Sequence, residues 1–445
     1  MRPYGPAATQ RGVVRECHPQ RRRARVWSAG LALLVILCLV SACGSTVAQP
    51  RLAGFAAHAL GADRMASRAP SDTVVAQQYL ARMSLDEKLG QLFLVEFVGP
   101  QYDGGNAAMV EQQHAGGILL YNREMPNLQA ASSLIQQAQA HAKLPLFVVV
   151  DEEGGWVDRL SDIYGFRPSA SMIAATGSLD FARAQAAQVA HDMKTVGLNF
   201  DLAPDVDVQL VDGPDQDTRT FGTTPGQVTS FSGAWLNALQ GQGVIGCLKH
   251  FPGLGAATTD AHLGLPLIAR SRDQIEQVEL APYRDLIKTG QVGCIMSTDL
   301  LMPALDASMP AELSYQIITG VLRHELGYDG VVVTDALYMD GIAQRFSLPD
   351  AGVMAIQAGC DFLMGPWLPW QTQAMIDALK GALASGQLSQ ARIDQSVLRL
   401  LKLKLRFGLL SRMVPTSGSG PTAALSPDGA RPTLEADVRR GVGAL

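Results

Sequence analysis

The chain has 445 residues, of which 47% are apolar and 17% charged, and its formal net charge is -5. These proportions are typical of a soluble globular protein and exclude a disordered or fibrous chain. Residues 1–42 contain seven arginines and one glutamate, so this segment carries +6 and the remainder carries -11. An acidic body without a basic stripe argues against a nucleic-acid partner.

The first 42 residues have the pattern of an export signal. Four arginines between positions 21 and 25 precede an apolar stretch over 26–40, which is short for a membrane span. The stretch ends in Val40-Ser41-Ala42-Cys43, and small residues before a cysteine resemble a bacterial lipobox. We therefore predict a signal peptide over 1–42 and lipidation at Cys43, with the body attached to the outer face of the cell membrane. A retained signal anchor is the alternative.

Composition then divides the rest of the chain. Residues 43–75, rich in Ala, Ser and Gly, predict a flexible tether, and residues 411–445, with two Pro-rich patches, predict a disordered tail. A single folded domain is expected over 76–410. It contains Cys247, Cys294 and Cys360, which lie in apolar runs and are expected to be buried thiols. Because no CxxC or paired-His spacing occurs, we expect no metal. We also expect no cofactor, and we expect the protein to be a monomer.

Short apolar runs in this domain alternate with segments of helical length. The runs predict strands at 92–97, 117–121, 146–150, 199–203, 244–249, 292–297, 330–334 and 361–364. Amphipathic spacing and start signals predict helices at 84–91, 180–196, 224–242, 271–289 and 314–326. Eight such repeats favour an α/β fold, the (β/α)8 TIM barrel. A doubly wound sheet is the alternative, but it would concentrate polar residues at one switch point, whereas here they follow nearly every strand.

The polar residues at the strand ends are mostly acidic. They are Asp151-Glu152-Glu153, Asp201 with Asp205 and Asp207, Lys249-His250, Asp299 and Asp335. A barrel gathers such residues at one mouth. The sequence contains no Gly-x-Ser-x-Gly elbow and no phosphate or dinucleotide loop. A carboxylate-rich site without metal ligands indicates sugar chemistry, in which a carboxylate attacks or stabilises an oxocarbenium-like centre.

Five motifs in order resemble glycoside hydrolase family 3, in particular its NagZ-type β-N-acetylglucosaminidases. They are VVDEEGG at 149–155, NFDLAPDVDV at 199–208, RTFG at 219–222, KHFPGLG at 249–255 followed by Asp260-Ala261-His262, and GVVVTDAL at 330–337. The resemblance extends over about 83–408. It implies a TIM barrel and a retaining exo-glycosidase that releases terminal β-linked N-acetylglucosamine from peptidoglycan fragments or chitin-like oligosaccharides.

The resemblance also implies the roles of the reacting residues. Asp335, at the end of a β-branched run, corresponds to the nucleophile, although an aspartate after a strand is also a common helix N-cap. Asp260 and His262 resemble the family's Asp-His acid/base, and residues i and i+2 of an extended segment project to the same side. Without the resemblance, a loop histidine would be read as a solvated surface group.

Four further residues are expected to clamp the sugar, namely Asp151, Arg219, Lys249 and His250. The alternatives are a salt bridge from Lys249 to a strand-end aspartate and a core position for His250 beside Phe251. Asp207 and Asn199 are expected to orient their neighbours rather than to bind the substrate.

Three positions depart from the family pattern. Trp156 replaces an arginine that many relatives have, Leu254 replaces a histidine, and Ser297-Thr298-Asp299 stands where relatives often carry a histidine. Either Asp299 is expected to hydrogen-bond the sugar, or the +1 subsite is expected to differ. The competing functions are a β-glucosidase, a β-glycoside phosphorylase and a lipoprotein that binds sugar without cleaving it.

Overall fold

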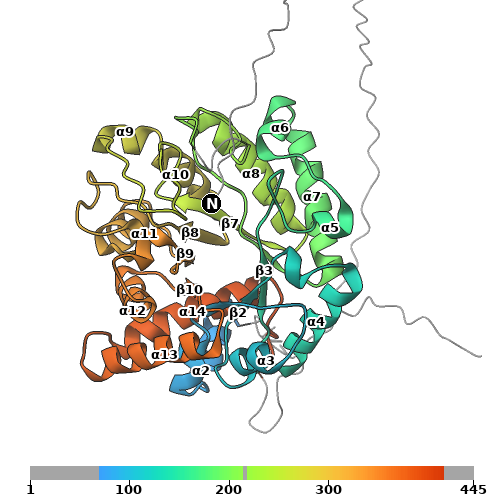
Figure 1. The fold of residues 1–445 in the computed structure, drawn as a ribbon, viewed down its shortest axis with the longest axis vertical. Helices are drawn as coiled ribbons and strands as arrows, with labels where there is room; N and C mark the ends of the chain where they lie inside the picture. The colour runs from blue at the N-terminus through green and yellow to red at the C-terminus, as the bar shows by residue number, and fades with distance from the viewer. Residues whose placement is uncertain (1–69, 214–217, 415–445) are drawn as a thin grey trace, which may run out of the picture. The chain divides into compact units, whose positions relative to one another are not determined.

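Eight parallel strands close into a barrel in the computed structural model, which describes residues 70–213 and 218–414 (Figure 1). In order around the barrel they are β1 (Phe93–Glu96), β2 (Gly117–Leu119), β3 (Phe147–Val150), β6 (Phe200–Asp201), β7 (Ile245–Phe251), β8 (Cys294–Ser297), β9 (Val331–Ala336) and β10 (Phe362–Met364). Strand β10 pairs with β1 and closes the ring. Each predicted run contributes one strand, so the barrel is confirmed over the doubly wound sheet.

Two strands were not predicted. After β3, the chain forms a short antiparallel hairpin of β4 (Glu152–Gly154) and β5 (Val157–Asp158). These residues are mostly acidic or glycine and lack the apolar alternation of a half-buried strand, although all three residues of β4 are buried.

Helices surround the barrel (Figure 1). Early in the chain they are α1 (Asp72–Leu80), α2 (Leu85–Gly90), α3 (Gly104–Glu111), η1 (Asn122–Glu124), α4 (Leu128–His141), α5 (Ser161–Tyr164), α6 (Ala170–Ala175), α7 (Leu179–Val196) and α8 (Pro225–Gly241). Later they are α9 (Arg272–Gln277), α10 (Leu280–Lys288), η2 (Ala311–Leu313), η3 (Gln316–Glu325), α11 (Asp340–Ala343), α12 (Leu348–Ala358), α13 (Pro369–Ala384) and α14 (Gln390–Arg406).

The predicted helices start at their expected caps, with two differences. Ser84 forms a capping box with Glu87, and the Thr224 side chain accepts from the Gln227 N–H. The segment 271–289 forms two helices, α9 and α10, instead of one, because Pro282 has no N–H to continue the helical ladder. The segment 314–326 contains the π-helical turns of η3 instead of a regular α-helix.

Aromatic rings and one buried lysine fill the lower part of the barrel. The ring of Phe147 meets those of Phe200 and Phe362 edge-on, at centroid distances of 5.5 and 5.7 Å. Helix α14 inserts Lys404, whose Nζ lies 4.8 Å from the Phe147 ring centroid and donates to Gln91 Oε1 at 2.8 Å. Burial lowers the pKa of Lys404 to about 7. This end of the barrel is therefore packed, so chemistry belongs at the other end.

The three cysteines of the barrel, Cys247, Cys294 and Cys360, are buried free thiols, as expected. The described body begins and ends slightly beyond the predicted boundaries. Helix α1 starts at Asp72, which pairs with Arg412 at 2.5 Å. The signal peptide, Cys43, most of the tether and most of the tail lie outside the described residues. Among the helices described, none has the length and apolar character needed to cross a membrane.

Candidate active site

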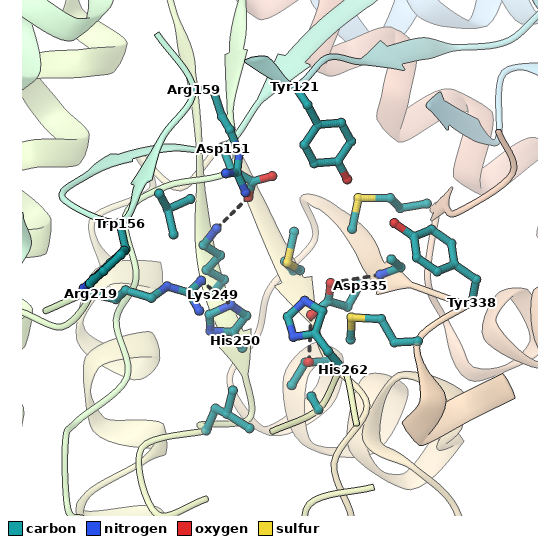
Figure 2. Close-up of a pocket in the computed structure, with 18 of the residues that line it drawn as sticks. Tyr121, Asp151, Trp156, Arg159, Arg219, Lys249, His250, His262, Asp335 and Tyr338 are labelled. Carbon is teal, nitrogen blue, oxygen red and sulfur yellow. Dashed lines mark hydrogen bonds and ion pairs between the residues drawn. The ribbon is translucent and has the colours of Figure 1, made fainter. Parts of the chain in front are cut away.

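A pocket of about 510 Å³ opens where the barrel strands end (Figure 2). Six of the predicted residues line it, namely Asp151, Arg219, Lys249, His250, His262 and Asp335. Asp151 directly follows β3, Lys249 and His250 lie near the end of β7, Asp335 lies near the end of β9, and the other two lie on loops. The parallel strands thus bring together residues that are up to 184 positions apart. Asp260, the seventh predicted residue, does not line the pocket but contacts the His262 ring nitrogen Nδ1.

Asp335 is fixed by three hydrogen bonds. Its Oδ2 accepts from the Thr298 hydroxyl at 2.8 Å, its Oδ1 accepts from the Ala336 N–H at 2.9 Å, and its own N–H donates to Glu312 Oε2 at 2.9 Å. Asp335 lies within β9, and the next helix, α11, begins only at Asp340. It therefore caps no helix, which removes the N-cap alternative.

Two further carboxyl groups are buried behind Asp335. Asp299 and Glu312 are both fully buried, and one oxygen of each has no hydrogen-bond partner among the described residues. Burial and the nearby charge of Asp335 raise the pKa of Asp299 to about 9. Burial and the charges of Asp299 and Asp335 raise the pKa of Glu312 well above its usual value. Asp299 is therefore neutral near pH 7, and the pKa of Glu312 is shifted in the same direction.

The expectation that Asp299 reaches the sugar is wrong. Asp299 is absent from the pocket lining, and a Cβ added to Gly341 would lie 2.0 Å from its Oδ2, so the carboxyl group packs against the start of α11. The preceding residue, Thr298, lines the pocket instead. Successive residues of an extended chain point to opposite sides, and position after a strand does not reveal which one faces the cavity.

The cationic side of the pocket is a network of ion pairs. Lys249 Nζ lies 2.7 Å from Asp151 Oδ1 and 2.6 Å from Glu153 Oε1, and Arg219 donates to both oxygens of Glu153 at 2.8 Å. Although burial raises the pKa of Glu153, Arg219 and Lys249 hold it well below its usual range. Lys249 thus forms the salt bridge proposed as its alternative role, and it lines the pocket as well.

His250 also joins this network. Its Nδ1 lies 2.8 Å from Asp207 Oδ2, and its Nε2 lies 3.3 Å from Arg219 Nη2. Burial lowers the pKa of His250, but the hydrogen bond to Asp207 and the charges of Asp207 and Asp205 together outweigh burial, so the net shift is upward. His250 is not a simple core residue beside Phe251, because it lines the pocket. Asn199 bonds Leu146 and Val148 across β3 and stays structural, as expected.

The described residues contain one group with metal-ligating atoms close together, namely Asp205, Asp207 and His250. Hydrogen bonds account for this arrangement. Asp207 accepts from His250 and from the Leu254 N–H at 2.6 Å, while its own N–H donates to Asp205 Oδ1 at 2.7 Å. Burial and the charge of Asp207 raise the pKa of Asp205 to about 8.

His262 lies in the loop that follows β7, beside Asp260. Its Nδ1 and its backbone N–H are both 2.8 Å from Asp260 Oδ1, so one carboxylate oxygen fixes the ring and the chain together. The His262 side chain is 63% exposed and lines the pocket. Because Asp260 holds Nδ1, the ring is oriented for proton transfer through Nε2.

Sequence reasoning missed several residues of the wall. Arg159, Tyr121 and Tyr338 line the pocket, and the Arg159 guanidinium lies 5.5 Å from the Tyr121 ring centroid. Behind them, burial raises the pKa of Glu96 to about 7, opposed by a hydrogen bond from Tyr338. Tyr121 and Glu96 stand at the ends of predicted strands, so their positions alone were a usable signal. Arg159 directly follows the unpredicted hairpin, where the sequence has no such signal.

Comparisons with known proteins identify a family for this chain. Residues 84–403 match the model described as "Glycosyl hydrolase family 3 N terminal domain". The chain is 36% identical over 336 residues to the beta-hexosaminidase LpqI of Mycobacterium tuberculosis, covering 73% of this chain and 84% of that protein. It is 35% identical over 327 residues to beta-hexosaminidase A of Pseudoalteromonas piscicida, covering 67% of this chain and 54% of that protein. The match thus spans about half the length of the second relative.

Solved structures give the same result. The family 3 β-N-acetylglucosaminidase from Paenibacillus superposes with a TM-score of 0.71 at 32% identity, covering 77% of this chain and 66% of that chain. The M. tuberculosis LpqI structure superposes with a TM-score of 0.68 at 34% identity, covering 74% and 96% respectively.

Proposed function

The chain belongs to glycosyl hydrolase family 3, and we propose that it is a retaining exo-β-N-acetylhexosaminidase. One observation carries the proposal. Asp335, His262 and the cationic clamp of Arg219, Lys249 and His250 line the same pocket at the mouth of the barrel. The relatives named beta-hexosaminidase support the same reaction.

The reaction proceeds by double displacement. In the first step a carboxylate oxygen of Asp335 attacks the anomeric carbon, the glycosidic bond breaks, and His262 gives its proton to the leaving oxygen. In the second step water attacks the same carbon, its proton passes to His262, and the bond to Asp335 breaks. Two inversions leave the released sugar in the β configuration, and His262 is protonated again.

The other residues serve these steps without changing covalently. Thr298 and the Ala336 N–H hold the two oxygens of Asp335. Asp260 orients the His262 ring and stabilises its positive charge. Lys249 and Arg219 are hydrogen-bond donors to ring hydroxyls, which fix the anomeric carbon over Asp335.

The substrates we propose are terminal β-linked N-acetylglucosamine residues of peptidoglycan fragments or chitin-like oligosaccharides. A phosphorylase of the same fold is the second candidate. It is favoured by the structural likeness to a protein titled "Beta-glucoside phosphorylase BglX", with a TM-score of 0.70 at 25% identity. A neutral histidine acid/base repels an anionic nucleophile less than a glutamate would, so phosphate could replace water.

The test is a panel of nitrophenyl glycosides assayed with and without phosphate. We expect the N-acetylglucosaminide to be cleaved fastest and phosphate to have no effect. NMR should show β-N-acetylglucosamine as the first product. Asp335→Asn should retain the fold and lose at least about a thousandfold in turnover, because the other carboxylate that lines the pocket, Asp151, is ion-paired with Lys249. An α product, or substantial residual turnover of this variant, would refute the mechanism.

We also propose that Cys43 carries a lipid anchor. The support is the run of arginines, the apolar stretch and the Val-Ser-Ala-Cys sequence at 40–43. Stable attachment needs more than one acyl chain, as in bacterial lipoproteins. Cys43→Ser should move the protein from the membrane fraction to the soluble fraction, or block its processing, with unchanged glycosidase activity. Membrane attachment that survives this substitution would favour a retained signal anchor.

A further inference from the structure

Trp156 is an exposed aromatic residue at the mouth of the pocket. Its side chain lines the pocket, yet the residue is 82% exposed. Within 70–213 and 218–414, its indole stacks on no other aromatic ring. Its position therefore contributes little to the core. A large apolar surface left open beside a functional cavity is typical of a binding surface.

The backbone that presents Trp156 is already ordered. Trp156 lies in the turn between β4 and β5, and the preceding Gly155 donates its N–H to the Arg167 carbonyl at 3.0 Å. Gly155 has a φ of +63°, and a Cβ there would lie 2.6 Å from Ser169 Cβ. The turn thus packs closely against the loop at 167–169. A ligand that contacts the indole meets a preformed surface and loses little free energy in ordering it.

The depth of the pocket places Trp156 outside the first sugar. The side chains of Lys249 and His250 are only 2% and 6% exposed, whereas the His262 side chain is 63% exposed. In the proposed reaction His262 protonates the glycosidic oxygen, so this oxygen lies between the buried clamp and the open mouth. In Figure 2, Arg219 and His250 are drawn between Trp156 and Asp335, so the indole is not next to the carboxylate that is proposed to attack.

The pocket lining also contains apolar residues, among them Leu254 and Ala261. A pyranose ring has an apolar C–H face that an indole can cover, while its hydroxyl groups stay in water at an exposed site. We propose that Trp156 is the stacking platform of an aglycone subsite, which binds the neutral sugar ring that follows the scissile bond. This proposal rests on the proposed function, because that function defines where the scissile bond lies.

Calorimetry with the full chain tests the proposal independently of turnover. In an Asp335→Asn background, which prevents hydrolysis, the ligands are N-acetylglucosamine and N,N′-diacetylchitobiose. Trp156→Ala should weaken binding of the disaccharide about tenfold more than binding of the monosaccharide. Trp156→Phe should keep most of the preference, because a smaller aromatic face remains. Trp370→Ala is the matched control, since Trp370 is 67% exposed but does not line the pocket.

Equal weakening of both ligands would overturn the proposal, because it would place Trp156 against the first sugar. An unchanged disaccharide affinity would overturn it as well. Failure of the proposed function has a different signature. In that case wild-type protein would not cleave the nitrophenyl N-acetylglucosaminide, whatever Trp156 contributes to disaccharide binding.

Discussion

The hydroxyl of Thr298 donates to Oδ2 of Asp335 at 2.8 Å and connects the ends of the neighbouring strands β8 and β9. The same hydroxyl lies 3.3 Å from Asp299 Oδ1. Thr298 therefore stands between the carboxylate that is proposed to attack and a neutral carboxyl group buried behind it. The bond orients one oxygen of Asp335, so the other, held by the Ala336 N–H, has a defined position as well.

Thr298→Val tests this contact with little change in volume. A hydrogen bond to a charged group is worth about 1.5–3 kcal/mol, so we expect kcat/KM to fall by about tenfold to a hundredfold. Covalent labelling by a fluorinated sugar should slow in proportion. Thr298→Ser keeps the hydroxyl and should remain within about threefold of wild type. A valine variant as active as wild type would show that the Ala336 N–H alone orients Asp335.

His262→Ala should distinguish substrates by their leaving groups. A poor leaving group needs the proton, so cleavage of chitobiose should fall by about 10²–10⁴-fold, whereas an activated nitrophenyl glycoside should lose far less in its first step. Hydrolysis of the glycosyl-enzyme then becomes limiting. Azide needs no base and should accelerate it.

Asp260→Asn is the milder counterpart, because it removes the charge that supports the ring but keeps the imidazole. It should show the same selectivity with a smaller loss. Equal loss on all leaving groups without azide rescue would make His262 a binding residue. Glu153 would then be a poor replacement donor, since Arg219 and Lys249 hold its pKa low even though burial raises it.

Asp299 should make the free energy of unfolding decrease as the pH rises. Burial and Asp335 raise its pKa to about 9 in the folded state, against about 3.9 in the unfolded chain, so folding takes up a proton between these values. The stability that Asp299 provides is full at low pH and is lost as the pH rises towards 9. Relative to wild type, Asp299→Asn should gain about 1.4 kcal/mol of unfolding free energy per pH unit from pH 5 to 8.

Urea titrations at four pH values measure this slope, and Asp285→Asn on the exposed face of α10 serves as the control. Glu312→Gln should give a slope of the same sign, because burial and its acidic neighbours raise the pKa of Glu312 as well. A slope near zero for Asp299→Asn would mean that Asp299 is ionised in the folded protein.

Lys404 should give the free energy of unfolding a pH dependence of the opposite sign. Burial lowers its pKa to about 7, so folding releases a proton between pH 7 and about 10.4, the usual value. The free energy of unfolding is therefore highest above pH 10.4, where Lys404 is neutral in both states, and it decreases as the pH falls towards 7 and the unfolded chain alone takes up the proton. Lys404→Met removes this dependence. Its unfolding free energy relative to wild type should therefore decrease by about 1.4 kcal/mol per unit between pH 7.5 and 9.5. A constant difference would show that Lys404 stays charged inside the barrel.

The strands and the polar residues at their ends could be predicted because they depend on local patterns, whereas Arg219, Asp260 and His262 were predicted from the resemblance to a family. Apolar runs at 146–150 and 330–334 mark buried strands, and the residues after parallel strands meet at one mouth whatever their separation in sequence. This is why Asp151, Lys249 and Asp335 could be placed together. Their catalytic roles stay predictions until the variants above are measured.

By itself, the sequence determined which residues stand at the strand ends, because the pattern of apolar residues indicates the length and order of the strands. Only the tertiary structure decided which of those side chains enter the pocket. Thr298 does and its neighbour Asp299 does not, and Arg159 arrives from a hairpin that has no apolar signal. The direction of a side chain depends on how the chain leaves its strand and on what packs against it, as Gly341 does against Asp299. Those contacts are made between segments far apart in sequence, so no local pattern records them.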